Sequence, residues 1–310
     1  MPRSFHRRAS EIPDMSEPPS PFRDAAALRA ELGSVGYLAD DALTTALLLA
    51  VRMQQPILLE GEPGVGKTEA GKALAAVLDT RLIRLQCYEG LSAAEALYEW
   101  NYPRQLLAIR LAESRGAVLR DADLFTDEYL LERPLLAAIS HPGPRPAVLL
   151  IDEVDRADDE FEAFLLELLA DAAITIAELG TRRAMVPPIV VLTSNRTRDL
   201  HDALKRRCLY HWIAYPDADR VAAIIRRRVN AADQLAAAVA ASVGRLRRLD
   251  LTKPPGVAEA INWAMALQVL GLSTVDESAA ERTLGAVLKY SEDVKAVREA
   301  GTTVLVGEDG

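Results

Sequence analysis

The chain has 310 residues, of which 50% are hydrophobic and 26% are charged, so it can bury one large core or two of ordinary size. Its formal net charge of −9 disfavours a broad nucleic-acid-binding surface. Two cysteines, Cys87 and Cys208, cannot build a disulfide framework or a structural zinc site. The longest apolar run, over residues 42–51, is much shorter than a membrane span, and the basic N-terminus is not followed by the apolar stretch of a signal peptide. We therefore expect a soluble, cytoplasmic protein.

The first 21 residues contain five of the 17 prolines, together with serines and scattered charges. This composition cannot form a core, and it predicts a flexible tail over residues 1–21. Helical patterning follows over residues 21–32 and again from 41 to about 53, where Asp40 is placed to cap the second helix.

Short apolar runs then alternate with helical stretches such as residues 68–78. The runs with strand character are residues 57–59, 82–87, 148–151 and 189–193. Continuous apolar runs are typical of parallel strands that are buried on both faces. The alternation predicts an α/β domain with a mostly parallel sheet over residues 22–216.

The patterning becomes purely helical from residue 218 to about 299, with turn signals at 253–256 and 271–273. This change predicts a small all-helical domain over residues 217–300, followed by a C-terminal tail over residues 301–310.

A glycine-rich loop follows the strand at 57–59. It consists of Gly61, Glu62, Pro63, Gly64, Val65, Gly66, Lys67 and Thr68. These residues match the phosphate-binding pattern G-x-x-x-x-G-K-[ST] at every position, and a strand before and a helix after the loop supply the context that the pattern needs. The glycines let backbone N–H groups turn around a phosphate, toward which the helix also directs its positive end. We expect Lys67 to reach the β- and γ-phosphates of ATP and the Thr68 hydroxyl to ligate Mg²⁺.

Two carboxylates follow the strand at 148–151. Asp152 is placed to hold Mg²⁺, directly or through water, and Glu153 to polarise a water for attack on the γ-phosphate. Two adjacent acids at the end of a buried strand are costly without a cation, which favours this interpretation over an ordinary solvated strand end.

Further polar residues follow the strand at 189–193. Asn195 could orient the attacking water between the carboxylates and the γ-phosphate. Arg206 and Arg207 come shortly after it, and arginine suits the neutralisation of charge that develops on a transferred phosphoryl group. The neighbouring Lys205 is better explained as a solvated basic residue.

In this order, the loop, the two acids, Asn195 and the arginine pair, followed by a helical domain, resemble the AAA+ ATPases. Within them the chain resembles the MoxR group, because residues 174–181 look like the β-hairpin of that group before the strand that carries Asn195. Finer features are similar to CoxD-type members. They are residues 98–102, 105–110, 125–126, 129–134 and 253–256. The resemblance covers about residues 35–295.

The resemblance implies a P-loop NTPase fold whose helical domain is a lid over the nucleotide, and a ring, usually of six subunits, with ATP at each boundary. The loop, the two acids and Asn195 would act from one subunit, and Arg206 or Arg207 from the next, as an arginine finger. The family's lid usually carries a sensor-2 arginine where this chain has Gly256 and Val257, so no residue is assigned to that role.

The resemblance also implies partners. MoxR-type ATPases are similar to chaperones that remodel client enzymes or help to insert their metal cofactors, often with a von Willebrand factor A-domain protein. CoxD-type members are associated with the maturation of a molybdenum-containing carbon monoxide dehydrogenase.

Other features allow more than one interpretation. The aromatic residues within 88–102 are either a client-contacting surface or local core packing. The basic runs at 226–228 and 245–248 fit solvated faces or subunit contacts better than DNA binding, and the four histidines show no metal-ligand spacing.

Three rival functions remain at this point. An AAA+ ATPase that acts on nucleic acid is the first, although the helical residues after 217 are too few for the second domain of a recombinase-type helicase. A nucleotide-gated scaffold is disfavoured by the presence of Glu153. A small-molecule kinase has no need for Asn195 followed by paired arginines.

Overall fold

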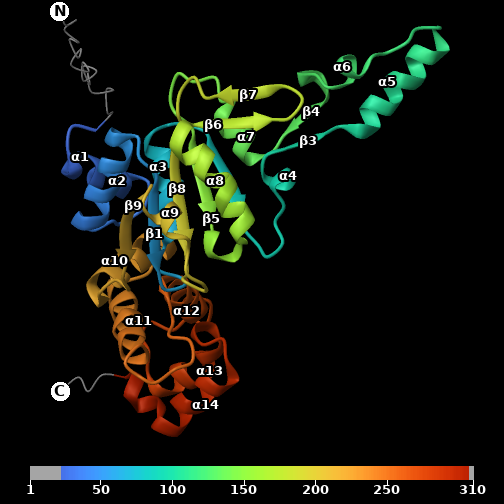
Figure 1. Ribbon diagram of the computed structural model, residues 1–310. Coiled ribbons are helices and arrows are strands. Elements are labelled where there is room, and N and C mark those ends of the chain that lie inside the picture. The colour runs from blue at the N-terminus through green and yellow to red at the C-terminus, as the bar shows by residue number, and fades with distance from the viewer. Residues whose placement is uncertain (1–21, 307–310) are drawn as a thin grey trace, which may run out of the picture.

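The computed structural model describes residues 22–306, and its core is a five-stranded parallel sheet with the strand order β2-β5-β8-β1-β9 (Figure 1). The strands are β1 (Ile57–Gly61), β2 (Leu82–Gln86), β5 (Val148–Asp152), β8 (Ile189–Ser194) and β9 (Leu209–Ile213). All four pairings between neighbours are parallel. The predicted α/β fold with a parallel sheet is confirmed, and β9 is an edge strand that the sequence analysis did not anticipate.

Helices cover both faces of this sheet. One face packs against α1 (Ala25–Ser34), α2 (Asp41–Met53) and α3 (Lys67–Val77), and the other against α7 (Pro134–Ile139), α8 (Asp159–Asp171) and α9 (Asp202–Lys205). Alternate residues of β5 pack against the helices on the two faces of the sheet, because successive side chains of a strand point to opposite faces. Val148 and Leu150 join the first layer, and Leu149 and Ile151 join the second.

Aspartates fix where several helices begin. The side chain of an N-cap aspartate accepts a hydrogen bond from a backbone N–H of the first turn, which would otherwise lack a partner. The capping residues are Asp24 for α1, Asp40 for α2, Asp158 for α8, Asp217 for α10 (Ala218–Val229) and Asp276 for α13 (Glu277–Val287). The predicted cap at Asp40 is therefore observed.

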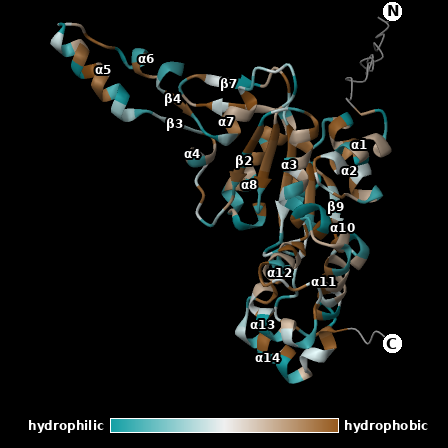
Figure 2. Cartoon of the chain, turned by 180° about the vertical axis from the view of Figure 1, so that it is seen from behind, coloured by the Kyte–Doolittle hydropathy of each residue, from teal (hydrophilic) through white to brown (hydrophobic). Residues whose placement is uncertain are grey.

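An arm extends away from the sheet between β2 and α7 (Figures 1 and 2). Its elements are α4 (Ala93–Ala96), β3 (Tyr98–Trp100), α5 (Tyr102–Ser114), α6 (Asp121–Leu124), a 3₁₀ turn over Asp127–Tyr129 and β4 (Leu130–Glu132), which pairs antiparallel with β3. In α5 the leucines Leu106 and Leu107 are 60% and 58% exposed. In the aromatic segment Trp100 is buried, as local core packing predicts, whereas Tyr88 and Tyr102 are exposed.

A second antiparallel hairpin lies above α8 and comprises β6 (Ala173–Ile176) and β7 (Gly180–Arg183). The hairpin that the resemblance implied at residues 174–181 is therefore present. An ion pair between Arg182 on β7 and Asp127 ties it to the base of the arm.

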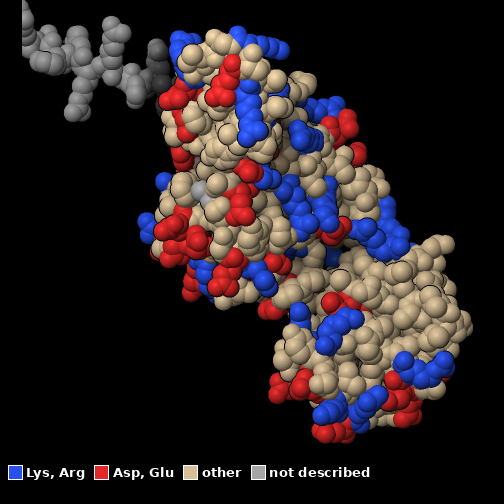
Figure 3. Space-filling view, turned by 90° about the vertical axis from the view of Figure 1, so that its right-hand side faces the viewer, with Lys and Arg blue, Asp and Glu red and all other residues tan. Residues whose placement is uncertain are grey.

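The C-terminal region is helical and joins the α/β core at a narrow waist (Figure 3). It consists of α10, α11 (Asp233–Leu246), α12 (Val257–Val269), α13 and α14 (Ser291–Ala300). Its core surrounds the fully buried Trp263, whose indole N–H donates to Thr283 Oγ1 at 2.7 Å.

The prediction of a tail beginning at residue 301 is wrong for residues 301–306. Thr302–Leu305 forms a 3₁₀ turn, and Leu305 is fully buried among the helices. Its carbonyl oxygen accepts hydrogen bonds from Ser242 and Arg245, so this turn is an integral part of the helical region. The tail predicted over 1–21 and residues 307–310 lie outside the described residues. Between residues 22 and 306, no helix has the length and apolar character needed to cross a membrane.

Candidate functional site

A cavity of about 330 Å³ lies at the carboxyl ends of β1, β5 and β8, against one side of α10 and the first turn of α12. Most of the residues predicted from the sequence line it. They are Pro63, Gly64, Val65, Gly66, Lys67, Thr68, Asp152, Glu153 and Asn195. Ligands of open parallel sheets bind at this edge, and the volume is within the range of small-molecule sites.

The phosphate loop has the shape that its glycines predict. Gly64 and Gly66 adopt φ values of 78° and 98°, in the left-handed region that glycine enters at no steric cost. Gly66 is the N-cap of α3, so the unpaired N–H groups of this helix face the cavity. The loop can therefore surround an anion with backbone donors.

Gly61 and Glu62 begin the loop and position its lysine. Their carbonyl oxygens accept hydrogen bonds from Lys67 Nζ at 2.7 and 2.8 Å. Burial lowers the pKa of Lys67, and the nearby carboxylates of Asp155 and Glu62 offset part of this effect. A buried ammonium beside the loop is suited to compensate phosphate charge.

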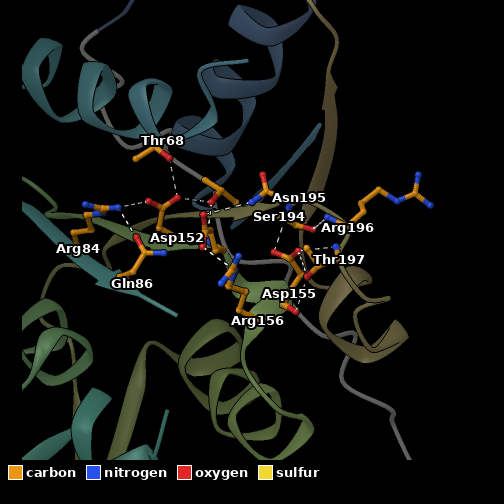
Figure 4. A network of polar contacts seen from close by, with 12 residues as sticks. Thr68, Arg84, Gln86, Asp152, Asp155, Arg156, Ser194, Asn195, Arg196 and Thr197 are labelled. Atoms are coloured by element: carbon orange, nitrogen blue, oxygen red, sulfur yellow. Dashed lines mark hydrogen bonds and ion pairs between the residues drawn. The ribbon is translucent and has the colours of Figure 1, made fainter. Parts of the chain in front are cut away.

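Asp152 is buried at the end of β5 and is satisfied on both oxygens. Oδ1 accepts hydrogen bonds from Thr68 Oγ1 at 2.9 Å and from Thr193 Oγ1 at 2.6 Å, and Oδ2 accepts one from Arg84 Nη2 at 2.6 Å (Figure 4). Mg²⁺ prefers hard oxygen ligands and usually takes one or two from the protein. The hydroxyl of Thr68 and the carboxylate of Asp152, already within hydrogen-bond distance, fit this requirement.

The next residue, Glu153, has an unfavourable backbone conformation. Its φ of 55° is in the left-handed region, which costs a residue other than glycine about 1–2 kcal/mol. The conformation is held by the backbone N–H of Glu153, which donates to Thr193 Oγ1 at 2.9 Å. Oε1 lies 3.5 Å from Asn195 Nδ2, and Oε2 lies 3.1 Å from Arg156 Nε. The structure thus brings Asn195 and Glu153 together, as the order of the motifs predicted.

Asp155 is a further member of the site that the sequence analysis missed. It is 1% exposed and accepts hydrogen bonds from the backbone N–H groups of Asn195 and Thr197 at 3.2 and 2.8 Å. It therefore fixes the loop that carries Asn195 to the turn that follows β5 and carries Glu153. The acid is visible in the sequence two residues after Glu153, but its partner lies about 40 residues further on.

The helical region completes the cavity with residues from several segments. Arg220 and Arg228 on α10 line it and form ion pairs with Asp40 at 3.0 Å and Glu69 at 2.9 Å. Tyr37 OH donates to Gly66 O at 3.4 Å, and burial raises the pKa of Tyr37. These contacts join the helical region and the segment before α2 to the phosphate loop, and no short sequence motif encodes them.

Arg206 and Arg207 lie outside the cavity. Both are exposed, and Arg207 Nη1 donates to Ala203 O of its own chain at 3.0 Å. They follow α9, a single turn that ends at Lys205, and precede β9, which begins at Leu209. The two arginines thus lie in the short connection between α9 and β9, away from the phosphate loop.

Comparison with known proteins agrees with this geometry. Residues 56–208 match the family model of the AAA domain, dynein-related subfamily. This part of the chain is therefore similar to an AAA domain. The matched residues of the AAA domain include the phosphate loop, Asp152, Glu153, Asn195 and both arginines, while the helical region lies beyond them.

Solved structures of low identity are also similar. One is the Thermotoga maritima RuvB Holliday junction branch migration motor, with 18% identity over 81% of this chain and 69% of that chain and a TM-score of 0.45. A substituted form of the same RuvB shows 17% identity over 87% of this chain and 72% of that chain, with a TM-score of 0.46. Among curated proteins, none matches the sequence. No group of three or more His, Cys, Asp or Glu side chains suited to a metal occurs between residues 22 and 306.

Proposed function

We propose that this chain binds ATP with Mg²⁺ and hydrolyses it. The observation that carries the proposal is the convergence of Thr68, Asp152, Glu153 and Asn195 on one cavity whose wall is a complete phosphate loop. Each of these groups has a distinct task in phosphoryl transfer, and a cavity that only bound nucleotide would not require Glu153 beside Asn195.

The roles follow from the contacts. The loop N–H groups and Lys67 hold the phosphates, and Thr68 and Asp152 hold Mg²⁺, which neutralises charge on the phosphate oxygens when bound. Glu153 accepts a proton from the attacking water, and the side-chain N–H of Asn195 orients that carboxylate and the water. The strained backbone of Glu153 and its link to Thr193 fix the direction of the carboxylate before nucleotide arrives.

The proposed site is completed by a neighbouring subunit. Arg206 and Arg207 are exposed and lie away from their own cavity, so they are free to enter the cavity of another copy as an arginine finger. This arrangement supports a ring, for which we propose six subunits in line with the AAA+ resemblance. The helical region, which lines the cavity through α10 and α12, would be the lid that responds to nucleotide.

We further propose that the ring is a cytoplasmic remodelling ATPase of MoxR type that assists the maturation of a client metalloenzyme. A molybdenum-containing hydroxylase related to carbon monoxide dehydrogenase is the proposed client, with a von Willebrand factor A-domain protein as the proposed partner. The β6–β7 hairpin and the arm with its exposed leucines support a role in contacting other proteins. On the face drawn in Figure 3, acidic as well as basic side chains occur on both parts of the molecule, so this face is not uniformly basic as a nucleic-acid-binding surface would be.

Two substitutions test the ATPase proposal. We expect Lys67→Ala to weaken ATP binding by at least tenfold, because the β- and γ-phosphate charge loses its ammonium. Glu153→Gln should keep ATP bound while hydrolysis stalls, since only the proton acceptor is removed. Lys72→Ala is the matched control, because Lys72 lies on the same helix and forms an exposed ion pair with Glu69. Equilibrium binding of a fluorescent ATP analogue and steady-state phosphate release measure the two effects, and normal turnover by Glu153→Gln would refute its assigned role.

The client is identified with the same variants. Glu153→Gln loaded with ATP is used as bait in an extract of the native host, and Lys67→Ala is the control that should capture nothing specific. A captured molybdenum enzyme or its precursor supports the proposed client. Capture of nucleic acid with salt-dependent affinity would instead support the rival function.

A further inference from the structure

Asp152, the proposed Mg²⁺ ligand, already carries a cation of its own chain. Arg84 Nη2 lies 2.6 Å from Asp152 Oδ2, and the aspartate side chain is only 3% exposed (Figure 4). A carboxylate this buried would be strongly destabilised without a compensating charge, and the guanidinium supplies it. The ion pair therefore compensates the buried negative charge of Asp152.

The sheet places Arg84 there by register. β2 is the edge strand beside β5, and Gln86 pairs with Asp152, so Arg84 lies two residues back along the same strand. Side chains two residues apart in a strand share a face, and both Arg84 and Gln86 are on the face opposite Ile83 and Leu85, which pack in the α7–α8 layer. This is the face covered by α3, whose Thr68 also reaches Asp152.

Arg84 has a second acceptor within reach. Its Nη2 also donates to Gln86 Oε1, and its side chain is 46% exposed, so on leaving Asp152 it can keep the hydrogen bond to Gln86 and its access to water. The other oxygen of Asp152 accepts hydrogen bonds from the hydroxyl groups of Thr68 and Thr193. These hydroxyls are neutral, so they do not repel a metal ion as the guanidinium does.

Magnesium and Arg84 cannot both be favoured at Asp152. A divalent ion between Thr68 and Asp152 would place two positive charges beside the guanidinium at the buried Asp152 carboxylate, where like charges repel. We propose that Arg84 is a built-in counter-ion that holds Asp152 in the nucleotide-free protein and competes with Mg²⁺ for it, so that Arg84 sets the metal concentration at which nucleotide is bound tightly. This inference rests on the proposed function of the site.

Two other roles for Arg84 predict different results. If Arg84 instead contacted the bound phosphates, its removal would weaken nucleotide binding even when no metal is present. If Arg84 only maintained the fold, its removal would change the stability without changing the affinity for metal. Metal affinity, nucleotide affinity without metal and thermal stability therefore separate the three roles.

The test compares Arg84→Gln with Arg81→Gln in the full chain. Arg81 is the matched control because it is exposed and precedes β2 at the end opposite Asp152, so its substitution removes the same charge next to the same strand but away from Asp152. Mn²⁺ binding is measured by electron paramagnetic resonance in the presence of ADP. ADP affinity is measured separately with excess chelator.

We expect Arg84→Gln to bind Mn²⁺ about tenfold more tightly than the unsubstituted chain, the change that loss of one charged hydrogen bond produces, with unchanged ADP affinity in chelator. Arg81→Gln should match the unsubstituted chain. Arg84→Lys keeps the charge but not the planar fork, so its shift should be in the same direction and smaller. Unchanged or weaker Mn²⁺ binding by both Arg84 variants would overturn the inference.

One further variant separates this inference from the proposed function. Asp152→Asn should lose Mn²⁺ binding whatever Arg84 does. If the unsubstituted chain binds neither ADP nor Mn²⁺, the proposed function fails. If it binds both, and Asp152→Asn abolishes the metal while Arg84→Gln leaves metal affinity unchanged, only the role of Arg84 is refuted.

Discussion

Gly64 of the phosphate loop and Gly256, the N-cap of α12, lie so close together that a side chain on either would meet the backbone of the other. A Cβ atom on Gly256 would be 2.9 Å from Gly64 Cα, and a Cβ atom on Gly64 would be 3.2 Å from Gly256 Cα. The backbone N–H of Val257 donates to Gly64 O at 2.9 Å. The helical region thus contacts the phosphate loop through main-chain atoms.

Gly256→Ala should separate these two backbones. The added methyl group meets backbone atoms that have no rotamer to change, so we expect about 1–3 kcal/mol of destabilisation and at least tenfold weaker ATP binding. Urea unfolding and equilibrium binding of a fluorescent ATP analogue measure these effects. Gly244→Ala is the control, because nothing lies within 4 Å of a Cβ atom there. Equal ATP affinity of the two variants would show that the contact has no influence on the nucleotide site.

Arg206 and Arg207 should act on the site of a neighbouring copy. Glu153→Gln keeps its arginines but cannot activate water, whereas Arg206→Ala/Arg207→Ala keeps its own site but cannot supply a finger. Neither chain alone should hydrolyse ATP, and a mixture should recover part of the activity because the first chain can lend its arginines to the second. An arginine finger contributes roughly 10³–10⁵ in rate, so the loss and the recovery are measurable by phosphate release.

The mixing experiment needs proof of assembly. Chains with different affinity tags show whether mixed oligomers form, and light scattering with a non-hydrolysed ATP analogue reports their size. Absence of recovery in confirmed mixed oligomers would mean that the arginines act within their own chain or are not the finger. A strictly monomeric protein with full activity would contradict the ring.

The two thiols should be unreactive in the folded protein. Burial raises the pKa of Cys87 to about 12, with the carboxylate of Asp152 adding to the shift, and burial also raises the pKa of Cys208 to about 12 against the opposing charge of Arg207. Because the raised pKa keeps each sulfur protonated, little thiolate exists at pH 8, and thiolate is the reactive form. We expect iodoacetamide to modify neither cysteine until the chain is unfolded, as measured by mass spectrometry. Fast modification of either one in the folded chain would contradict its burial.

Asp40→Ala should destabilise the protein more than Asp24→Ala. Both residues cap helices, through hydrogen bonds of 2.7 Å to Leu43 N and 2.8 Å to Ala27 N, but Asp40 also forms the ion pair with Arg220 that joins α2 to the helical region. We expect a loss of about 1 kcal/mol for Asp24→Ala and about 1–2 kcal/mol for Asp40→Ala from urea unfolding at pH 7.

The same pair gives a pH dependence. Partial burial raises the pKa of Asp40, but the hydrogen bonds from Leu43 and Arg220 outweigh it and bring the pKa below its usual value of 3.8. A carboxyl with a lowered folded-state pKa contributes its stability above the unfolded value and loses it as the pH falls through the folded value. The effect of Asp40→Ala should therefore be complete at pH 7 and shrink below pH 3.8. A difference that grew on acidification would refute this account.

Local patterns predicted the parts of the molecule that are encoded locally. Continuous apolar runs gave β1, β5 and β8, and the glycine pattern gave the phosphate loop, because a strand buried on both faces and a loop with left-handed glycines restrict the residues that can occupy them. The edge strand β9 was missed because Leu209 and His211 are only half-buried and Tyr210 is exposed, so no continuous apolar run marks it.

The remaining features depend on contacts between distant residues. Arg84 and Asp152 form their ion pair across 68 positions, and Gly64 meets Gly256 across a still longer interval. Neither contact has a sequence pattern of its own, since it exists only after the sheet and the helical region have been placed. The arm helix α5 was missed for another reason, because its leucines are exposed and so do not form a single buried face.

The pairing of β1 with two later strands has a consequence for folding during translation. Ile57 pairs with Val191 of β8 and with Leu209 of β9, so both sheet neighbours of the phosphate-loop strand are synthesised long after it. Pairings this distant in sequence form slowly, since the entropy of closing the intervening loop is lost before the contacts are gained. During translation the phosphate loop leaves the ribosome early but acquires its final shape only after residue 213 has followed. A growing chain shorter than this carries every residue of the loop and still lacks the framework that would let it hold ATP.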